Sequence, residues 1–192
     1  MDILVSSVIR FLKCTYSMYF YLSIGTNIDP EANAAGIVKL LCKRFDQIAL
    51  FPFVRTEPED VALSDAFLNA LAVVFAKESS EQVKAALNTI EAQMGRDRSD
   101  PLRSVKNRPA DIDIITCSSE LDFTPFASAP EGYIQLCFHQ QRDAAVDLSA
   151  YGLASHKGPA TVYIDTLTGE IVVVDDEFDR FKHRVEASLE GQ

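Results

Sequence analysis

The stretch SSEQVKAALNTIEAQMG, residues 79–95, decides the fold because it is the clearest helix in the chain. Its apolar residues recur at helical spacing, Ser80 can cap its start, and Gly95 suits its end. A basic loop over residues 96–107 follows. ADIDIITC, residues 110–117, is then predicted to be a buried strand, so a helix leads into a strand here.

Four further elements are predicted upstream of this helix. YFYLSIG, residues 19–25, is aromatic and β-branched and predicts a buried strand, and residues 30–45 carry apolar residues at helical spacing. Residues 47–58 and 66–77 predict two more strands. The order β-α-β-β-α-β predicts an α+β fold, a ferredoxin-like sandwich in which two helices cover one face of an antiparallel sheet.

The expected fold divides the chain into three parts. Residues 1–17 are expected to be an N-terminal extension, because they are too few and too charged to span a membrane and lack the features of a signal peptide. Residues 18–118 form the expected ferredoxin-like core. Residues 119–192 are expected to be a diverged C-terminal extension that packs on the same domain.

The C-terminal extension contains three segments with a recognisable pattern. YIQLCFHQQ, residues 133–141, could be a strand. ATVYIDTLTGEIVVVDD, residues 160–176, has two apolar arms around a turn and predicts a β-hairpin. The last residues of the chain suggest a short terminal helix.

Composition and charge limit the classes of function. With 192 residues, of which 47% are hydrophobic and 24% charged, the chain can bury an ordinary globular core. Its net charge of −10 disfavours nucleic acid and anionic membranes as partners. Four widely spaced cysteines without a CxxC pattern indicate reduced thiols of a cytoplasmic protein, and the three histidines show no metal-ligand spacing.

Two carboxylates in the last predicted strand are the first sign of a site. Asp111 and Asp113 are one residue apart and so point to one face, while Ile112 and Ile114 point to the other. Such a pair suits Mg²⁺, which takes one or two carboxylates from a protein and its other ligands from water and phosphates. The arginines of the basic loop match phosphate groups in geometry and charge. This pattern favours phosphoryl transfer, which depends on positioning and charge neutralisation.

A structural explanation of the same residues stays open. Asp111 and Asp113 could be surface acids on an edge strand, with the loop arginines as their counter-ions. The sequence contains no P-loop, GxGxxG or HExxH pattern, so it does not support a conventional nucleoside triphosphatase site.

Five motifs in the same order resemble the 6-hydroxymethyl-7,8-dihydropterin pyrophosphokinase family of folate biosynthesis. They are Gly25-Thr26-Asn27, Arg55-Thr56-Glu57-Pro58, Phe67-Leu68-Asn69, Ile-Glu-x-x-x-Gly-Arg-x-Arg from Ile90 to Arg98, and Arg-x-x-Asp-Ile-Asp-Ile from Arg108 to Ile114. The resemblance covers most of the predicted core. It implies transfer of a pyrophosphoryl group from ATP to the hydroxymethyl group of the pterin, with two Mg²⁺ ions.

The resemblance also implies a role for each matching residue, grouped by what the residue would bind. The expected residues are Asp111 and Asp113 for the metal ions, Arg96 and Arg108 as catalytic contacts to the transferring phosphates, Arg98 and Glu91 for ATP, and Thr56, Phe67 and Asn69 for the pterin. Glu91 could instead be a solvated acid at the helix end. The segment 25–27 is expected to be a structural turn more than a ligand contact.

The chain departs from the family pattern on the side of the nucleotide base and the pterin. The family has a Trp in the basic loop, where Val105 stands here, and this chain has no Trp at all. Pro125-Phe126 stands where the family has Pro-His, and residues 131–138 lack the expected Arg, although Phe138 could be an aromatic wall for the pterin. The turn after Thr56 carries three additional acids, Glu57, Glu59 and Asp60.

Two functions therefore compete. The carboxylates and arginines favour a Mg²⁺-dependent pyrophosphokinase that uses ATP and a pterin-like small molecule. The departures favour a diverged, catalytically inactive homologue that binds nucleotide or pterin or interacts with other proteins. An unrelated ferredoxin-like domain is a third alternative.

Overall fold

The computed structural model describes residues 17–57, 65–99, 101, 107–139 and 144–190. Its strands are β1 (Met18–Thr26), β2 (Gln47–Leu50), β3 (Val54–Thr56), β4 (Phe67–Ala76), β5 (Asp111–Ser118), β6 (Ala160–Ile164) and β7 (Ile171–Val174). Its helices are α1 (Pro30–Phe45), α2 (Ser80–Gln93), α3 (Thr124–Ala127), α4 (Gly132–His139) and α6 (Asp179–Glu190), with the 3₁₀ turn η1 (Ser149–Tyr151). Within this described part, no helix is long and apolar enough to cross a membrane.

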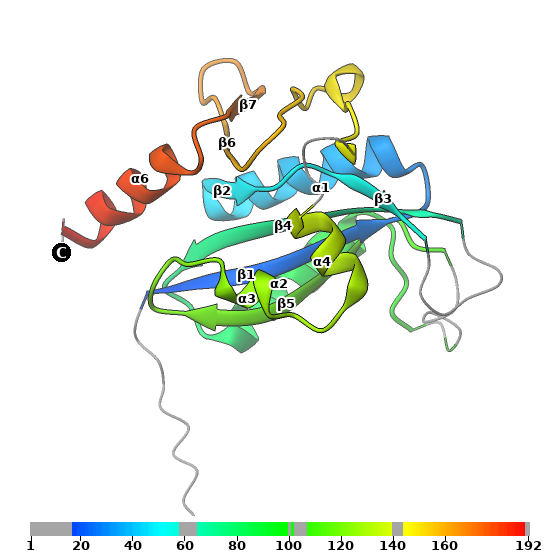
Figure 1. The fold of residues 1–192 in the computed structure, drawn as a ribbon, viewed down its shortest axis with the longest axis horizontal. Helices are drawn as coiled ribbons and strands as arrows, with labels where there is room; N and C mark the ends of the chain where they lie inside the picture. The colour runs from blue at the N-terminus through cyan, green and yellow to red at the C-terminus, as the bar shows by residue number, and fades with distance from the viewer. Residues whose placement is uncertain (1–16, 58–64, 100, 102–106, 140–143, 191–192) are drawn as a thin grey trace, which may run out of the picture.

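One antiparallel sheet organises the molecule. Its strand order is β5-β1-β4-β2-β6-β7, and β3 pairs with β4 off this path. Figure 1 shows the long strands β1, β4 and β5 side by side, with the hairpin β6–β7 at the top of the view. The combination of helices with an antiparallel sheet confirms the predicted α+β class.

Helices cover both faces of this sheet. α1 and α2 pack on one face, over a core that includes Ile24, Leu41 and Leu87. On the other face, α3, α4 and α6 pack over a second core that includes Phe51 and Phe126. From the sequence we predicted the first helical layer and the terminal helix α6 of the second, whereas α3 and α4 were not predicted.

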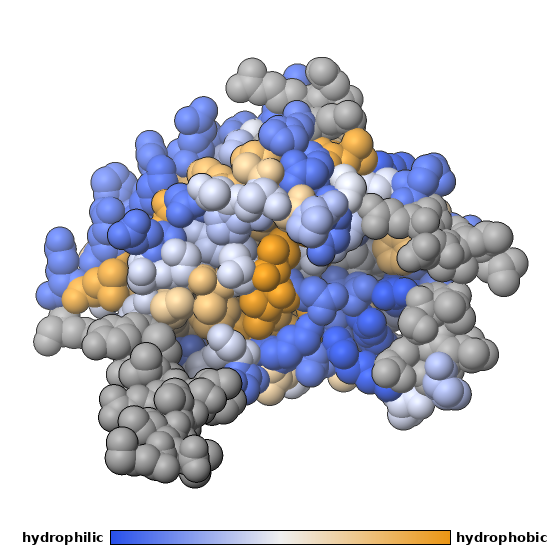
Figure 2. All heavy atoms as spheres, turned by 60° about the horizontal axis from the view of Figure 1, so that its bottom comes forward, coloured by the Kyte–Doolittle hydropathy of each residue, from blue (hydrophilic) through white to orange (hydrophobic). Residues whose placement is uncertain are grey.

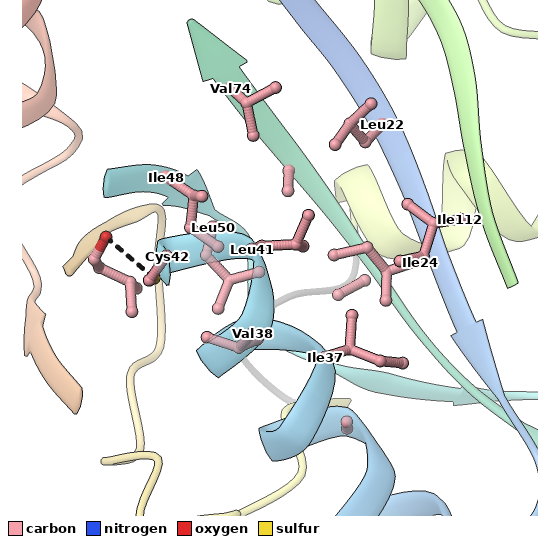
Figure 3. Close-up of a cluster of buried hydrophobic side chains, with 14 of the residues drawn as sticks. Leu22, Ile24, Ile37, Val38, Leu41, Cys42, Ile48, Leu50, Val74 and Ile112 are labelled. Carbon is pink, nitrogen blue, oxygen red and sulfur yellow. Dashed lines mark hydrogen bonds between the residues drawn. The ribbon is translucent and has the colours of Figure 1, made fainter. Parts of the chain in front are cut away.

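The first core joins the C-terminal hairpin to the rest of the chain. Figure 3 shows Cys42 of α1 beside this core, and its thiol donates to the backbone carbonyl of Val162 in β6 at 3.5 Å. Burial raises the pKa of Cys42 to about 12, so it stays a thiol at neutral pH. Cys42, Cys117 and Cys137 are free, as expected for reduced thiols, and Cys14 lies outside the described residues.

The predicted helix at residues 79–95 is confirmed as α2, with a shifted cap. Ser79 is the N-cap residue instead of Ser80. The Ser79 hydroxyl accepts from the backbone N–H of Gln82 at 3.3 Å, and the Gln82 side chain accepts from the Ser79 N–H at 2.9 Å. This reciprocal capping box fixes the start of the helix, and hence the face that it presents to β5.

Two predictions of strands need correction. The single strand expected over residues 47–58 is two short strands, because Pro52 has no N–H to donate to the ladder. The strand considered for residues 133–141 is wrong, since residues 133–139 lie in the helix α4 and residues 140–141 are outside the described part. Ile134 and Cys137 lie three residues apart on its buried side, which a short apolar run does not distinguish from a strand.

The C-terminal hairpin and terminal helix are confirmed as β6, β7 and α6. The Asp165 side chain accepts from the backbone N–H groups of Leu167 and Thr168, at 2.8 and 2.9 Å, and Gly169 adopts a φ of 73°. These contacts close the turn. β6 pairs with β2, so the hairpin extends the core sheet.

Large apolar side chains are rarely exposed on the described part of the chain. The exposed ones are Ile28, Tyr151, Leu167 and Leu189. Figure 2 shows one face of the molecule, on which small apolar areas lie between larger hydrophilic ones. The surface therefore offers mainly polar and charged chemistry to a ligand.

Candidate active site

The register of three strands brings the expected site residues together. Gly25 of β1 pairs with Asn69 of β4 on one side and with Asp111 of β5 on the other. Ser23 pairs with Asp113, two residues further along the same ladder. Ile24 and Ile112 belong to the core under α1 and α2, so their neighbours in the strands face the opposite side of the sheet. Asp111 and Asp113 thus share one face, as the alternation predicted.

Gly25 is required by the close approach of a neighbouring side chain. A Cβ atom at this position would lie 2.5 Å from Oδ1 of Asn69. The Asn69 amide in turn donates to the Thr56 hydroxyl at 2.6 Å, and both side chains are buried. Two of the residues expected to bind the pterin therefore form a fixed, neutral pair beside Gly25.

Asn27 holds the segment that carries Arg108. Its backbone N–H donates to the Arg108 carbonyl at 3.1 Å, and its side-chain carbonyl accepts from the Arg108 N–H at 2.7 Å. Its amide nitrogen donates to Asn107 Oδ1 at 2.8 Å and to the backbone carbonyl of Asp65 at 3.2 Å. The buried Asn27 is therefore a structural clamp, which agrees with a structural role for the segment 25–27.

Two arginines bind Asp111. Arg108 Nη1 donates to Asp111 Oδ2 at 2.6 Å, and Arg96 Nη1 donates to Asp111 Oδ1. The Arg108 guanidinium also lies over the ring of Phe67, at 5.6 Å from its centroid. Arg96 and Arg108, the expected catalytic arginines, thus both contact Asp111, an expected metal ligand. Arg108 also contacts Phe67, which was expected to bind the pterin.

Glu91 is the buried anchor of the arginines. Its side chain is 0% exposed and accepts from Arg96 Nη1 at 3.0 Å, from Arg98 Nε at 2.7 Å and from the backbone N–H of Ile112 at 2.7 Å. It is therefore not a solvated helix-end acid. It connects α2, the start of the basic loop and the strand that carries the two aspartates.

The pKa of Arg96 reflects this environment. Burial acts to lower its pKa, but the hydrogen bond and charge of Asp111 and the charges of Glu91 and Asp113 more than offset burial. The pKa of Arg96 is therefore raised above its ordinary value. Arg96 stays a cation at any physiological pH.

Lys84 completes the network, and sequence reasoning missed it. Its ammonium group donates to Asp113 Oδ1 at 2.7 Å and to the backbone carbonyl of Ile112 at 3.0 Å. Lys84 precedes Glu91 by two helical turns, so both lie on the face of α2 that meets β5. This spacing between Lys84 and Glu91 was the signal in the sequence that could have identified Lys84. The four cations and three carboxylates of the network leave one positive charge in excess.

An open groove of about 580 Å³ begins at Asp113. It runs between α2 and β5, and its lining includes Lys84, Asn88 and Ile114. A ligand that reaches the aspartates from this side would contact the helix through these polar and apolar side chains.

The aspartates fit a Mg²⁺ ion that arrives together with phosphate. Among the described residues there is no group of three or more His, Cys, Asp or Glu that could hold a metal. Two carboxylates on one face are nevertheless the protein share that Mg²⁺ accepts when phosphates and water supply its other ligands. Three cationic side chains already contact these two carboxylates, so a metal ion is favoured here only together with the negative charge of the phosphates.

Some features named from sequence lie elsewhere. Val105, Glu59 and Asp60 are outside the described residues. Phe138 packs in the second core, with ring centroids 5.9 Å from Phe51 and 6.2 Å from Phe126.

Comparison with known proteins supports the resemblance. The family model described as 7,8-dihydro-6-hydroxymethylpterin-pyrophosphokinase (HPPK) matches residues 21–141, which is more than half of the chain. No curated protein matches the chain.

Proposed function

The chain belongs to the 7,8-dihydro-6-hydroxymethylpterin-pyrophosphokinase family, and from this membership we propose that it is an active enzyme. The proposed reaction transfers the terminal pyrophosphoryl group of ATP to the hydroxymethyl oxygen of 6-hydroxymethyl-7,8-dihydropterin. AMP is the leaving group, and the hydroxyl proton is lost to solvent. Pyrophosphokinase activity in folate biosynthesis is the general function of the family.

The observation that carries this proposal is the pair Asp111 and Asp113 on one sheet face with Arg96 and Arg108 in contact with it. In the proposed complex Asp111 and Asp113 hold Mg²⁺, which neutralises phosphate charge when bound. Arg96 and Arg108 orient the transferring phosphates, because guanidinium groups bind phosphate oxygens in a fixed geometry. The excess positive charge of the network favours a polyanion.

The nucleotide and the pterin are assigned to opposite sides of Gly25. We place the nucleoside part of ATP in the groove between α2 and β5. Arg98 and Glu91 were expected to bind ATP, and we propose that Glu91 acts by holding Arg96 and Arg98 in position. Thr56, Phe67 and Asn69 are proposed to bind the pterin, where the fixed Asn69–Thr56 pair supports a planar polar ligand.

Two broader proposals accompany this one. The order β5-β1-β4-β2, with α1 and α2 on one face, supports the ferredoxin-like arrangement of the core. The free cysteines of the described part support a reducing, cytoplasmic location.

The test is an assay of AMP formation from ATP, Mg²⁺ and the hydroxymethyl dihydropterin. We expect AMP to form only when the pterin and Mg²⁺ are both present, and calorimetry with a non-hydrolysable ATP analogue to show Mg²⁺-dependent binding that the pterin strengthens. AMP formation without pterin dependence would point to another acceptor. Failure to bind either ligand would refute the proposal.

The alternative is a diverged homologue that binds but does not catalyse. The observation in its favour is the C-terminal addition of β6, β7 and α6, which lies beyond the matched residues 21–141 and packs on the core. Binding of the nucleotide analogue without any AMP formation would favour this alternative.

A further inference from the structure

Lys84 contacts Asp113 and lines the groove assigned to the nucleoside, but it has no assigned role in the transfer of the pyrophosphoryl group. We propose that Lys84 is a resident counter-ion of Asp113, which a divalent cation must displace, so that Lys84 lowers the affinity of the aspartate pair for metal. This inference rests on the proposed function, because it takes Asp111 and Asp113 as the metal-binding pair.

The ammonium group lies against one of the two carboxylates that are proposed to hold the metal ion. Lys84 Nζ is 2.7 Å from Asp113 Oδ1 and 3.0 Å from the carbonyl oxygen of Ile112, so two acceptors fix its position. A metal ion that binds Asp113 needs an oxygen of the same carboxylate, and its charge repels the ammonium group. The two cations therefore compete for one carboxylate.

The solvent exposure of Lys84 and Asp113 allows a metal ion to replace Lys84 at Asp113. The Asp113 side chain is 60% exposed and that of Lys84 is 33% exposed, whereas the Asp111 side chain is 23% exposed. Partly exposed ion pairs contribute little to stability and exchange partners readily. Asp113 can thus release Lys84 to solvent or to the adjoining groove, which Lys84 also lines.

The two carboxylates differ in what holds them. Asp111 is bound by Arg96 and Arg108, which are expected to stay beside the metal because they also contact phosphate. Lys84 has no such second partner in the proposed reaction. It balances the charge of Asp113 beside Asp111 until a metal takes its place.

The direction in which Lys84→Met changes the metal affinity distinguishes competition from structural support. If Lys84 only supports the orientation of Asp113, then Lys84→Met weakens metal binding. If Lys84 competes, the same substitution strengthens it. We expect the intact chain with Lys84→Met to bind Mn²⁺, followed by the electron paramagnetic resonance of free Mn²⁺, about fivefold more tightly than the wild type.

Two control variants separate competition from net charge. Lys84→Arg keeps a cation beside Asp113 and should leave Mn²⁺ affinity within about twofold of the wild type. Lys77→Met removes the same charge at the far end of β4, where Lys77 contacts Ser188, and should also leave the affinity unchanged. Thermal unfolding checks that each variant is folded.

The possible failures are distinguishable. Unchanged or weaker Mn²⁺ binding by folded Lys84→Met, with wild-type binding that Asp113→Asn abolishes, would overturn the competition and leave the proposed metal site intact. Absence of Mn²⁺ binding in both the wild type and Lys84→Met would overturn the inference, whereas the proposed function, in which the metal arrives with phosphate, is tested separately by AMP formation.

Discussion

The two sides of Gly25 are built by different means. Toward β5, the site consists of charged side chains in ion pairs, such as Asp111 with Arg96 and Arg108. Toward β4, it consists of a neutral hydrogen bond between Asn69 and Thr56 and a close packing contact at Gly25. Ion pairs can exchange partners with a metal or a phosphate, whereas the packed neutral pair is already in its final arrangement. The charged side is therefore suited to mobile, polyanionic ligands and the neutral side to one flat ligand of fixed shape.

Glu91→Ala should cause the largest loss of stability, because it removes the one fully buried charge of the charged side. Its arginine and backbone partners would lose their acceptor in a buried place, and breaking a buried ion pair costs about 3–5 kcal/mol. Urea denaturation measures this loss. Glu186→Ala, on the exposed face of α6, is the control. A loss below about 1 kcal/mol would mean that the charged side does not depend on Glu91.

Asp111→Asn should cause the largest loss of activity with little change in shape. It removes the charge that faces two arginines and the proposed metal, so AMP formation should fall about a hundredfold to a thousandfold. Initial rates at saturating ATP measure this. Asp147→Asn, at an exposed position, should keep full activity. A decrease of less than about tenfold would assign the chemistry to other groups.

Gly25→Ala should damage the neutral side. The new Cβ would meet the side-chain oxygen of Asn69, and overpacking of this kind costs about 1–3 kcal/mol. Pterin affinity should fall more than nucleotide affinity, which calorimetry with each ligand can measure. In the double variant with Asn69→Ala, the lost stability should return in part. If the Gly25→Ala variant were as stable as the wild type, the close contact between residue 25 and Asn69 would not separate the two sides.

Arg55→Ala should have the smallest effect. Arg55 pairs with Glu31, but the two side chains are 51% and 26% exposed, so the expected change in unfolding free energy is within about 0.5 kcal/mol. The comparison with Glu91→Ala isolates burial as the cause of the difference, because both changes break a carboxylate–guanidinium pair. Equal losses in the two variants would contradict that explanation.

The local part of the site could be predicted from the sequence. Strand alternation alone placed Asp111 and Asp113 on one face. The strand register then puts Gly25 beside Asp111 and Asn69 on the other side of Gly25. Element order predicted the α+β class because each core element has a clear hydrophobic period. The hairpin after residue 160 was predicted for the same reason.

The features that could not be predicted from the sequence depend on packing between distant segments. Lys84 and Glu91 acquire their partners only when α2 lies beside β5, and no local pattern states which strand a helix face will meet. α4 was ambiguous because a short, mostly apolar run fits either a strand or a helix. In the second helical layer, α3 and α4 came from residues that lacked a strong helical period, whereas α6 was predicted.

The contacts of Ile112 have a consequence for how the sheet meets other chains. β5 is an edge strand, and open edges invite pairing with further strands. Glu91 and Lys84 occupy the backbone N–H and C=O of Ile112, the second residue of β5, so the start of this edge offers no free backbone groups at that residue. At the opposite side, β6 covers β2 and leaves only the four residues of β7 at the margin, between Glu170 and Asp175. The side chains that organise the site therefore also restrict strand pairing at the start of the β5 edge.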